Sequence, residues 1–158
     1  MAYVTLTTDT KNFHYARFTG SASAPNRILT GTKPASATGS TVFGSSLNYI
    51  KLKIYSSSNT ASQPIHVFGW NYVQELNSYV PQLLVSVTAN VSTASQTVNG
   101  DTVYELTSWS IVQGDAKIYN GVTATTPGGF IVADTLGCEY IEVYGNAANT
   151  YHVIYAGL

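Results

Sequence analysis

Three histidines are the residues of this chain best suited to bind a metal or transfer protons, but their spacing gives them no local partners. His14, His66 and His152 fall in three different predicted strands, so only the fold could bring them together. No pair of the form His-x-x-x-His occurs, which would present two ring nitrogens on one face. Alternation puts His66 on the face of Phe68 and His152 on that of Ile154, which is typical of structural histidines. The sequence therefore predicts no metal site.

Serine and carboxylate side chains also lack the spacing that catalysis requires. No Gly-x-Ser-x-Gly elbow occurs, and the many serines lie in Ser/Thr-rich segments without a positioned base. Glu139 and Glu142 form the nearest pair of carboxylates, and their odd spacing puts them on opposite faces of one strand. Asp115 and Asp134 lack the Asp-x-Asp ladder of a calcium loop. We expect no enzyme activity, no catalytic residue and no cofactor.

Alternation with a period of two organises the chain after residue 46. The clearest segment is 47–55, where Ile50, Leu52 and Ile54 alternate with tyrosines and lysines, as in a half-buried strand. Apolar spacing of three and four, typical of a helix, is absent over any helix-length run, and only 71–80 has room for a turn or two. Further strands are predicted at 65–72, 83–88, 103–106, 109–112, 116–119, 130–133, 138–144 and 151–156.

Turn residues support this division into short strands. Asn99-Gly100 stands between two strand-like segments, as in a two-residue hairpin. Residues 145–149 are predicted to close another hairpin, which would join 138–144 to the last strand. Many short strands with tight turns predict an all-β fold, a two-sheet antiparallel sandwich, jelly-roll-like rather than immunoglobulin-like.

The chain divides into two regions within a single domain. Residues 47–158 form the predicted β-sandwich core. Residues 1–46 combine N-terminal strands with a Ser/Ala/Gly/Thr-rich stretch over 20–46 that offers few side chains to bury. This stretch is either a long surface loop or an extended arm that orders against a neighbouring subunit.

The charge is low in total and uneven along the chain. Charged residues make up 9% of the 158 residues, against 44% hydrophobic residues, and the net charge of −1 provides no basic field for nucleic acid. Residues 1–79 carry six Lys or Arg and two Asp or Glu, a net charge of +4. Residues 80–158 carry one Lys and six Asp or Glu, a net charge of −5. Either the two halves pack together and neutralise each other, or the asymmetry steers head-to-tail contact between subunits.

Compartment signals favour a protein that is made and kept in a cytoplasm. Cys138 is the only cysteine, so an intrachain disulfide framework is impossible, and a buried thiol is expected. The segment after Met1 has neither the basic start nor the apolar core of a secretory signal. No run approaches the roughly 18 apolar residues of a membrane-spanning helix, so we expect no membrane partner.

Aromatic residues are the main positive signal for binding. Twelve Tyr, five Phe and two Trp make up 12% of the chain, and tyrosine suits interfaces because it joins an apolar ring to a polar tip. The predicted C-terminal hairpin would carry a tyrosine-rich face, with interface candidates Tyr140, Glu142, Tyr144, Tyr151 and Tyr155. Alternatively, Trp70, Tyr72 and Trp109 would stack on sugar rings, or the tryptophans would fill the core.

In composition the chain resembles the small all-β accessory proteins of tailed bacteriophage particles, especially capsid decoration or cement proteins. The resemblance rests on the unsignalled Met1 start, the segment 20–46, the strand-and-turn pattern from Leu47 and the end Tyr155 to Leu158; no family motif is matched. It implies a virion protein that binds the outside of a shell made by a major capsid protein, commonly as a homotrimer, and stabilises it. The alternatives are a carbohydrate- or receptor-binding module and a tail or neck component.

Overall fold

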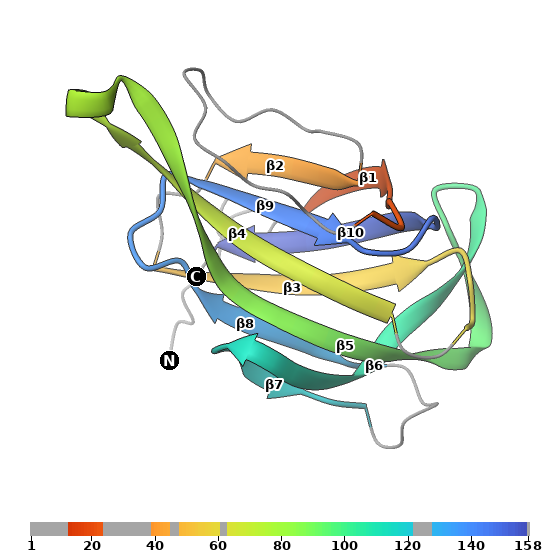
Figure 1. The fold of residues 1–158 in the computed structure, drawn as a ribbon. Coiled ribbons are helices and arrows are strands. Elements are labelled where there is room, and N and C mark those ends of the chain that lie inside the picture. Colours follow the sequence, from red (N-terminus) through yellow and green to blue (C-terminus); the bar gives the residue numbers. More distant parts are fainter. Residues whose placement is uncertain (1–12, 24–38, 45–47, 61–62, 122–127, 158) are drawn as a thin grey trace, which may run out of the picture.

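A computed structural model describes residues 13–23, 39–44, 48–60, 63–121 and 128–157, which form ten strands and one short 3₁₀ turn (Figure 1). The elements are β1 (His14–Thr19), β2 (Ser40–Gly44), β3 (Tyr49–Ser56), β4 (Gln63–Val73), η1 (Gln74–Leu76), β5 (Ser78–Val98), β6 (Asp101–Gly114), β7 (Lys117–Tyr119), β8 (Phe130–Asp134), β9 (Tyr140–Gly145) and β10 (Thr150–Gly157). The predicted all-β class is confirmed.

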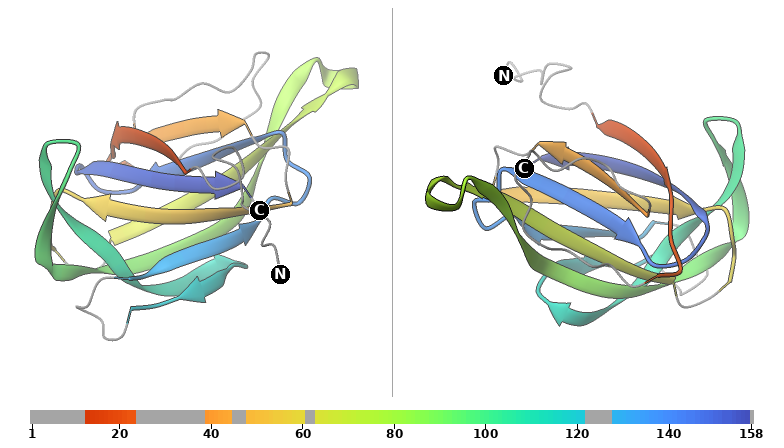
Figure 2. Two further views of the ribbon diagram at one scale, coloured as in Figure 1. Left: turned by 180° about the vertical axis from the view of Figure 1, so that it is seen from behind. Right: turned by 45° about the horizontal axis from the view of Figure 1, so that its top comes forward.

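One antiparallel sheet curves until it nearly closes into a barrel (Figures 1 and 2). Its strand order is β1-β10-β3-β6-β5-β4-β9-β2, with β8 pairing β3 and β7 beside this path. The two end strands, β1 and β2, contact each other across the remaining gap. The two-sheet jelly-roll sandwich that the sequence predicted is not confirmed, because the strands follow one another in a single barrel-like sheet.

Two long bent strands explain the difference. β5 runs over 21 residues and β6 over 14, and their pairing contains three register shifts. Such β-bulges bend a strand and increase its twist, which lets a single sheet wrap around one core. One of these shifts falls at Thr107, and β6 continues through it. The segments 103–106 and 109–112, which the sequence predicted as two strands, are therefore parts of one continuous strand.

Alternation decides which side chains fill the barrel. Ile50, Leu52 and Ile54 of β3 point inward and are fully buried, whereas Lys51 and Lys53 lie on the outer face, as the sequence predicted. The same period gives each neighbouring strand an inner apolar row. Together these rows form one core cluster of Phe18, Ile50, Leu52, Ile54, Ile65, Val67, Leu84, Val85, Val87, Ala89, Val91, Leu106, Trp109, Ile131, Ala133, Cys138, Ile141, Val143, Tyr151 and Val153.

The thiol of Cys138 belongs to this core. It is a free, buried cysteine, as the sequence predicted, and its Sγ accepts a hydrogen bond from Gln82 Nε2 at 3.0 Å. Burial raises the pKa of the Cys138 thiol, and the hydrogen bond from Gln82 opposes this with a smaller effect. A protonated, enclosed thiol is a packing residue rather than a nucleophile.

The last two strands do not pair with each other, so the predicted C-terminal hairpin is wrong. β9 pairs β4 on one side and β2 on the other, whereas β10 lies between β1 and β3. The segment 146–149 therefore crosses from one part of the sheet to another (Figure 1). Pairing with strands distant in the sequence satisfies the backbone of both, which a local turn signal does not reveal.

The turn at Asn99-Gly100 is confirmed. Both residues have positive φ, 50° and 86°, as a type I′ hairpin requires, and Val98 pairs with Asp101 across it. The only helical element among the described residues is η1, a single turn within the segment 71–80. No helix in the described part of the chain is long and apolar enough to cross a membrane.

Candidate functional site

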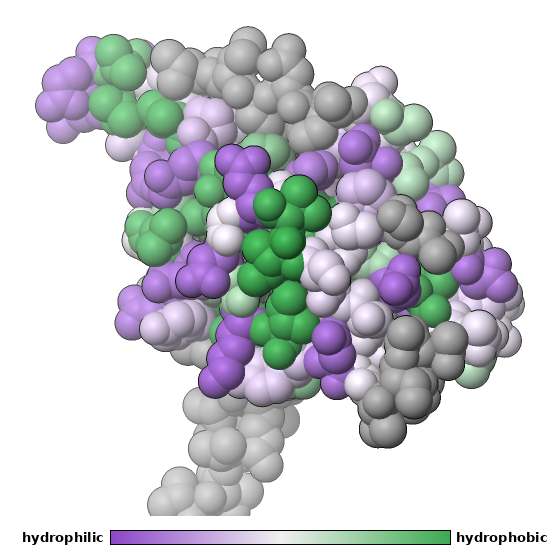
Figure 3. Space-filling model, turned by 60° about the horizontal axis from the view of Figure 1, so that its bottom comes forward, coloured by the Kyte–Doolittle hydropathy of each residue, from purple (hydrophilic) through white to green (hydrophobic). Residues whose placement is uncertain are grey.

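The β4–β5 hairpin projects beyond the barrel as a two-stranded ribbon (Figures 1 and 2). Its tip is η1, in which no residue is buried, and the turn ends at Asn77 with a left-handed φ of 49°. Tyr72 and Leu76 are 43% and 56% exposed. In the space-filling view the ribbon stands clear of the body, with hydrophobic and hydrophilic side chains together at its end (Figure 3).

A row of tyrosines runs from the end of this ribbon to β9. Tyr72 pairs with Tyr79 across the two strands, and their ring centroids lie 5.2 Å apart with an angle of 60° between the ring planes. The ring of Tyr79 also contacts that of Tyr140 on β9, with 5.7 Å between the centroids and 73° between the planes. These edge-to-face contacts are favourable for aromatic rings. We call Tyr72, Tyr79 and Tyr140 the tyrosine ladder. The Tyr72 hydroxyl also donates to the side-chain oxygen of Asn77, which ties the ladder to the tip.

Beneath the ladder lies a buried carboxylate. Glu142 of β9 accepts a hydrogen bond from Trp70 Nε1 at 3.3 Å and another from Ser40 Oγ at 2.5 Å. Trp70 is only 4% exposed, because its ring packs on this outer face beside β9. A buried carboxylate is tolerated when hydrogen bonds satisfy its oxygens. Glu142 and Trp70 thus hold β2, β9 and β4 together.

The structure places the glycan-stacking candidates in different environments. Trp70 is buried against Glu142, and Trp109 is 3% exposed within the core cluster, so neither presents a ring face to a ligand. Tyr72 alone lies on an exposed surface. The sequence could not separate these cases, because period-two alternation does not say whether an outer face is covered.

The interface candidates are also dispersed. Tyr151 and Tyr155 point inward. The Tyr151 ring stacks on Phe18 with 5.3 Å between the ring centroids, and the Tyr155 ring stacks on Phe43 with 3.8 Å between the centroids. Tyr144 is buried on the outer face, and its hydroxyl donates to the backbone oxygen of Ser23. Of the five predicted residues, only Tyr140 joins the tyrosine ladder. The continuous tyrosine face predicted for 140–155 does not form, because β9 and β10 are not neighbours in the sheet.

A polar cluster joins the β5–β6 hairpin to the outer face of β1 and β10. His152 Nε2 lies 3.0 Å from Asp101 Oδ2, its Nδ1 lies 2.6 Å from the Tyr15 hydroxyl, and Arg17 approaches the same Asp101 oxygen at 3.2 Å. His152 is fully buried by these neighbours. The sequence missed this pairing because 51 residues separate Asp101 from His152. The cluster fastens the hairpin to the barrel.

His66 lies elsewhere, with its Nδ1 2.6 Å from Ser86 Oγ on β5. Burial lowers the pKa of His66 below its ordinary value of 6.5. The His66 imidazole of the unfolded chain therefore binds a proton at a higher pH than that of the folded chain. The neutral, buried His66 contributes to the stability of the fold above pH 6.5, and this contribution is lost as the pH falls through the lower pKa of the folded chain.

We expect the free energy of unfolding to decrease from pH 7 to pH 5, and to decrease less steeply in His66→Gln. Urea denaturation at a series of pH values measures this slope. The matched control is His14→Gln, because His14 is exposed on β1 and its replacement should leave the slope as it is in the unmodified chain. Equal slopes in the unmodified chain and His66→Gln would contradict the assignment.

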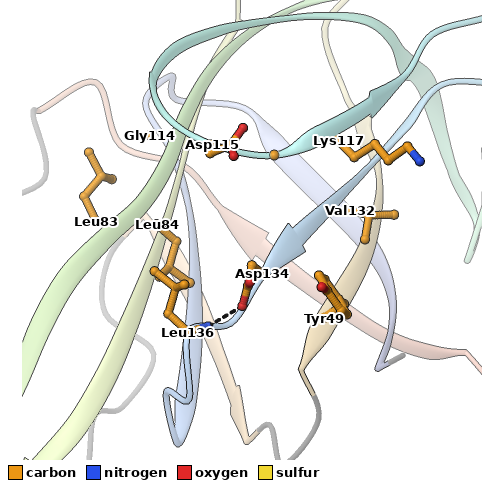
Figure 4. Close-up of a pocket in the computed structure, with 10 residues that line it drawn as sticks. Tyr49, Leu83, Leu84, Gly114, Asp115, Lys117, Val132, Asp134 and Leu136 are labelled. Atoms are coloured by element: carbon orange, nitrogen blue, oxygen red, sulfur yellow. Dashed lines mark hydrogen bonds between the residues drawn. The ribbon is translucent and has the colours of Figure 1, made fainter.

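A pocket of about 750 Å³ opens at one end of the barrel (Figure 4). We call it the mouth pocket. Its walls come from the start of β3, from β5, from the β6–β7 connection and from the end of β8. The residues that line it are Tyr49, Leu83, Leu84, Gly114, Asp115, Ala116, Lys117, Val132, Asp134 and Leu136. An apolar lining with a few polar groups is typical of a binding pocket in the mouth of a barrel.

No group of three His, Cys, Asp or Glu suited to a metal ion occurs in the part of the chain that the structure describes. The Ser86 side chain beside His66 is buried, so a substrate would not reach it. Comparison of the chain with known protein families, with curated proteins and with solved structures finds no match in any of the three.

Proposed function

We propose that this protein is a non-enzymatic structural component of a virus particle, a capsid decoration or cement protein that assembles as a symmetric oligomer, a homotrimer, on a bacteriophage shell. Its partners would be further copies of itself and the major capsid protein, and its location the virion. The observation that carries the proposal is the projecting β4–β5 ribbon with its exposed tip.

A free two-stranded ribbon is marginally stable in water, because it has little apolar surface to bury. Here the ribbon extends past the core and exposes Tyr72 and Leu76 at its end, with Glu75 as the one charged residue of the tip turn. Aromatic and apolar side chains with few charges are typical of the centre of a protein interface. The ribbon suits insertion between subunits of a shell.

The surface composition supports the same proposal. Only 9% of the residues are charged, well below the roughly 25% of average soluble proteins. Exposed apolar residues occur away from the ribbon too, such as Ile111 and Val112 on β6, and a stripe of hydrophobic side chains edged by hydrophilic ones crosses the lower face (Figure 3). Such surfaces favour a protein that is covered in its working state.

The test uses antibodies against the purified chain on virus particles purified from the sample that yielded the sequence. Gold labelling over the shell in electron micrographs would support a decoration protein, and labelling restricted to the tail or neck would support the alternative of a tail or neck component. Particles without label, together with absence of the chain from their protein content, would overturn both.

We expect Leu76→Glu to weaken binding to shells stripped of the protein by about tenfold or more, because it puts a charge in the centre of the proposed contact. Co-sedimentation of the purified variant with the shells measures this. Thr93→Glu, which adds the same charge at an exposed position of β5 far along the strand, is the matched control and should bind as the unmodified chain does. Equal losses in both variants would remove the ribbon from the contact.

A carbohydrate- or receptor-binding module is the second candidate, and the tyrosine ladder, in which Tyr72 is exposed and Tyr79 and Tyr140 are half-buried, is the observation in its favour. The exposed ring of Tyr72 is available for stacking on a sugar. A glycan array with the purified chain separates the two candidates: saturable sugar binding that Tyr72→Ala abolishes would favour the module, and its absence would favour the decoration protein.

A further inference from the structure

Every lysine and arginine that the structure describes lies on one face of the sheet. Lys117 of β7 pairs with Val132 of β8, which pairs with Lys51 of β3, so these side chains form a row across three strands. Lys53 comes two residues after Lys51 and therefore points the same way. Arg17 of β1 joins this face, because it pairs through β10 with the outer row of β3. We call this outer surface of β7, β8, β3, β10 and β1 the lysine face (Figure 2, left).

Most exposed aromatic rings lie on the same surface. Among the described residues five Phe or Tyr side chains are exposed, and Tyr72 on the ribbon is the one that lies elsewhere. The other four are Phe13, Tyr15, Tyr49 and Tyr119. The half-buried ring of Phe130 on β8 lies among them, opposite Tyr119. The lysine face thus combines cations with exposed rings.

The lysines and rings are arranged against one another. Lys51 Nζ lies 4.2 Å from the centre of the Phe130 ring and 5.3 Å from that of Phe13. The Tyr119 ring stacks on Phe130 with 4.6 Å between the centroids and 12° between the planes, and Lys117 Nζ lies 5.4 Å from the centre of the Tyr119 ring. Each ammonium is attracted to the electrons of an aromatic ring, which holds it on this surface.

Two of the four cations have no carboxylate partner in the part of the chain that the structure describes. Arg17 and Lys53 each pair with a carboxylate of β6, whereas Lys51 and Lys117 form no ion pair there. In the close-up the Lys117 side chain extends away from Asp115 (Figure 4). The centre of the lysine face is therefore positive, and its free charges suit an anionic ligand.

The ratio of rings to free cations indicates which anion fits. Nucleic acid depends on many Lys or Arg contacts to its phosphates, and two free lysines on a chain of net charge −1 provide few. Protein interfaces are depleted in lysine. A polysaccharide with widely spaced carboxylates needs few cations, and its sugar rings pack on aromatic side chains.

We propose that the lysine face binds an acidic polysaccharide, a sugar polymer whose carboxylates are separated by neutral sugars. Lys51 and Lys117 would each bind one carboxylate through charge-assisted hydrogen bonds. Their backbones are two strands apart, roughly 10 Å, which leaves room for a sugar on the ring of Tyr119. This inference goes beyond the proposed function, since it holds whether or not the chain decorates a particle, and its surface differs from that of Tyr72.

The experiment is isothermal titration calorimetry of the purified chain with hyaluronate, a polymer with a carboxylate on every second sugar, at low and at moderate salt. Neutral dextran and a single-stranded oligothymidine are titrated in parallel. We expect saturable binding of hyaluronate that weakens as the salt concentration rises, and no binding of dextran. Lys51→Gln and Lys117→Gln should each weaken the binding about tenfold, since each removes a hydrogen bond to a charged group. Tyr119→Ala should also weaken it.

Matched variants separate the lysine face from overall charge and from the ribbon. Thr93→Glu lowers the net charge by one, as each lysine variant does, at an exposed position of β5. Tyr72→Ala removes an exposed ring of the ribbon. Both should bind hyaluronate as the unmodified chain does, and Lys51→Arg, which retains the charge, should bind nearly as well.

Each outcome decides the proposal. Losses confined to the variants of Lys51, Lys117 and Tyr119 support it. Equal losses in Thr93→Glu or Tyr72→Ala, equal binding of dextran, tighter binding of oligothymidine, or no saturable binding of hyaluronate overturn it. Urea denaturation shows whether each variant is folded, and the exposed Lys117→Gln still decides the proposal if Tyr119→Ala unfolds. The particle labelling test of the proposed function stands apart from all these results.

Discussion

Replacement of Trp109 by alanine should lower the free energy of unfolding by about 3–5 kcal/mol, the range for large-to-small substitution of a buried tryptophan. Trp109 is 3% exposed in the core cluster, opposite Ala89 of β5. Its backbone N–H donates to Asn120 Oδ1 at 2.8 Å, which holds the strand in place beside the loop after β7. Deleting the ring leaves a cavity that a closed sheet cannot readily fill.

Urea denaturation of Trp109→Ala and Trp109→Phe measures this effect. The phenylalanine variant should lose much less stability, because it retains most of the ring and removes an indole Nε1 that is buried without a partner among the described residues. A loss below 1 kcal/mol on replacement by alanine, roughly the value for an exposed site, would show that Trp109 is not a core residue. Such a result would restore it as a candidate for ligand stacking.

Replacement of Gly114 by alanine should destabilise the chain by roughly 3 kcal/mol, from two causes that add. The backbone φ is +79°, which a Cβ disfavours, and a Cβ there would lie 2.2 Å from the backbone oxygen of Leu84. The oxygen belongs to the neighbouring strand β5, so relief requires the two strands to separate at the wall of the mouth pocket. We expect a lower thermal midpoint.

Gly100→Ala is the matched control, because it separates backbone strain from the steric clash. Gly100 has a similar φ of +86°, in the turn of the β5–β6 hairpin, but a Cβ there would meet no atom within 4 Å. This variant should lose only about 1–2 kcal/mol, the cost of a left-handed backbone for a residue with a side chain. Equal losses in Gly100→Ala and Gly114→Ala would show that contact with Leu84 does not restrict position 114.

Local pattern was sufficient for most strands. The alternation in 47–55 predicted both the strand β3 and its inner face of Ile50, Leu52 and Ile54, since a period of two assigns each side chain to one face of the strand. The Asn99-Gly100 turn was equally predictable, because few residue pairs adopt two consecutive positive φ angles. These features depend on neighbours in the sequence.

Features of the candidate sites were not predictable, because they depend on residues far apart in the chain. Glu142 meets Trp70 across 72 residues, and the mouth pocket draws Tyr49, Leu84 and Asp134 from three strands. The predicted tyrosine face of 140–155 failed for the same reason: its two strands are adjacent in sequence but not in the sheet.

The sequence by itself determined the all-β class, the positions of most strands, the tight turn at residues 99–100, the low charge and the charge difference between the halves. These properties follow from composition and local periodicity. Only the tertiary structure decided that one sheet curves almost into a barrel, that Trp70 and Trp109 are buried, and where the projecting ribbon and the mouth pocket lie. The physical reason is that strand pairing and the covering of an outer face are set by long-range packing, which alternation along a single strand cannot specify.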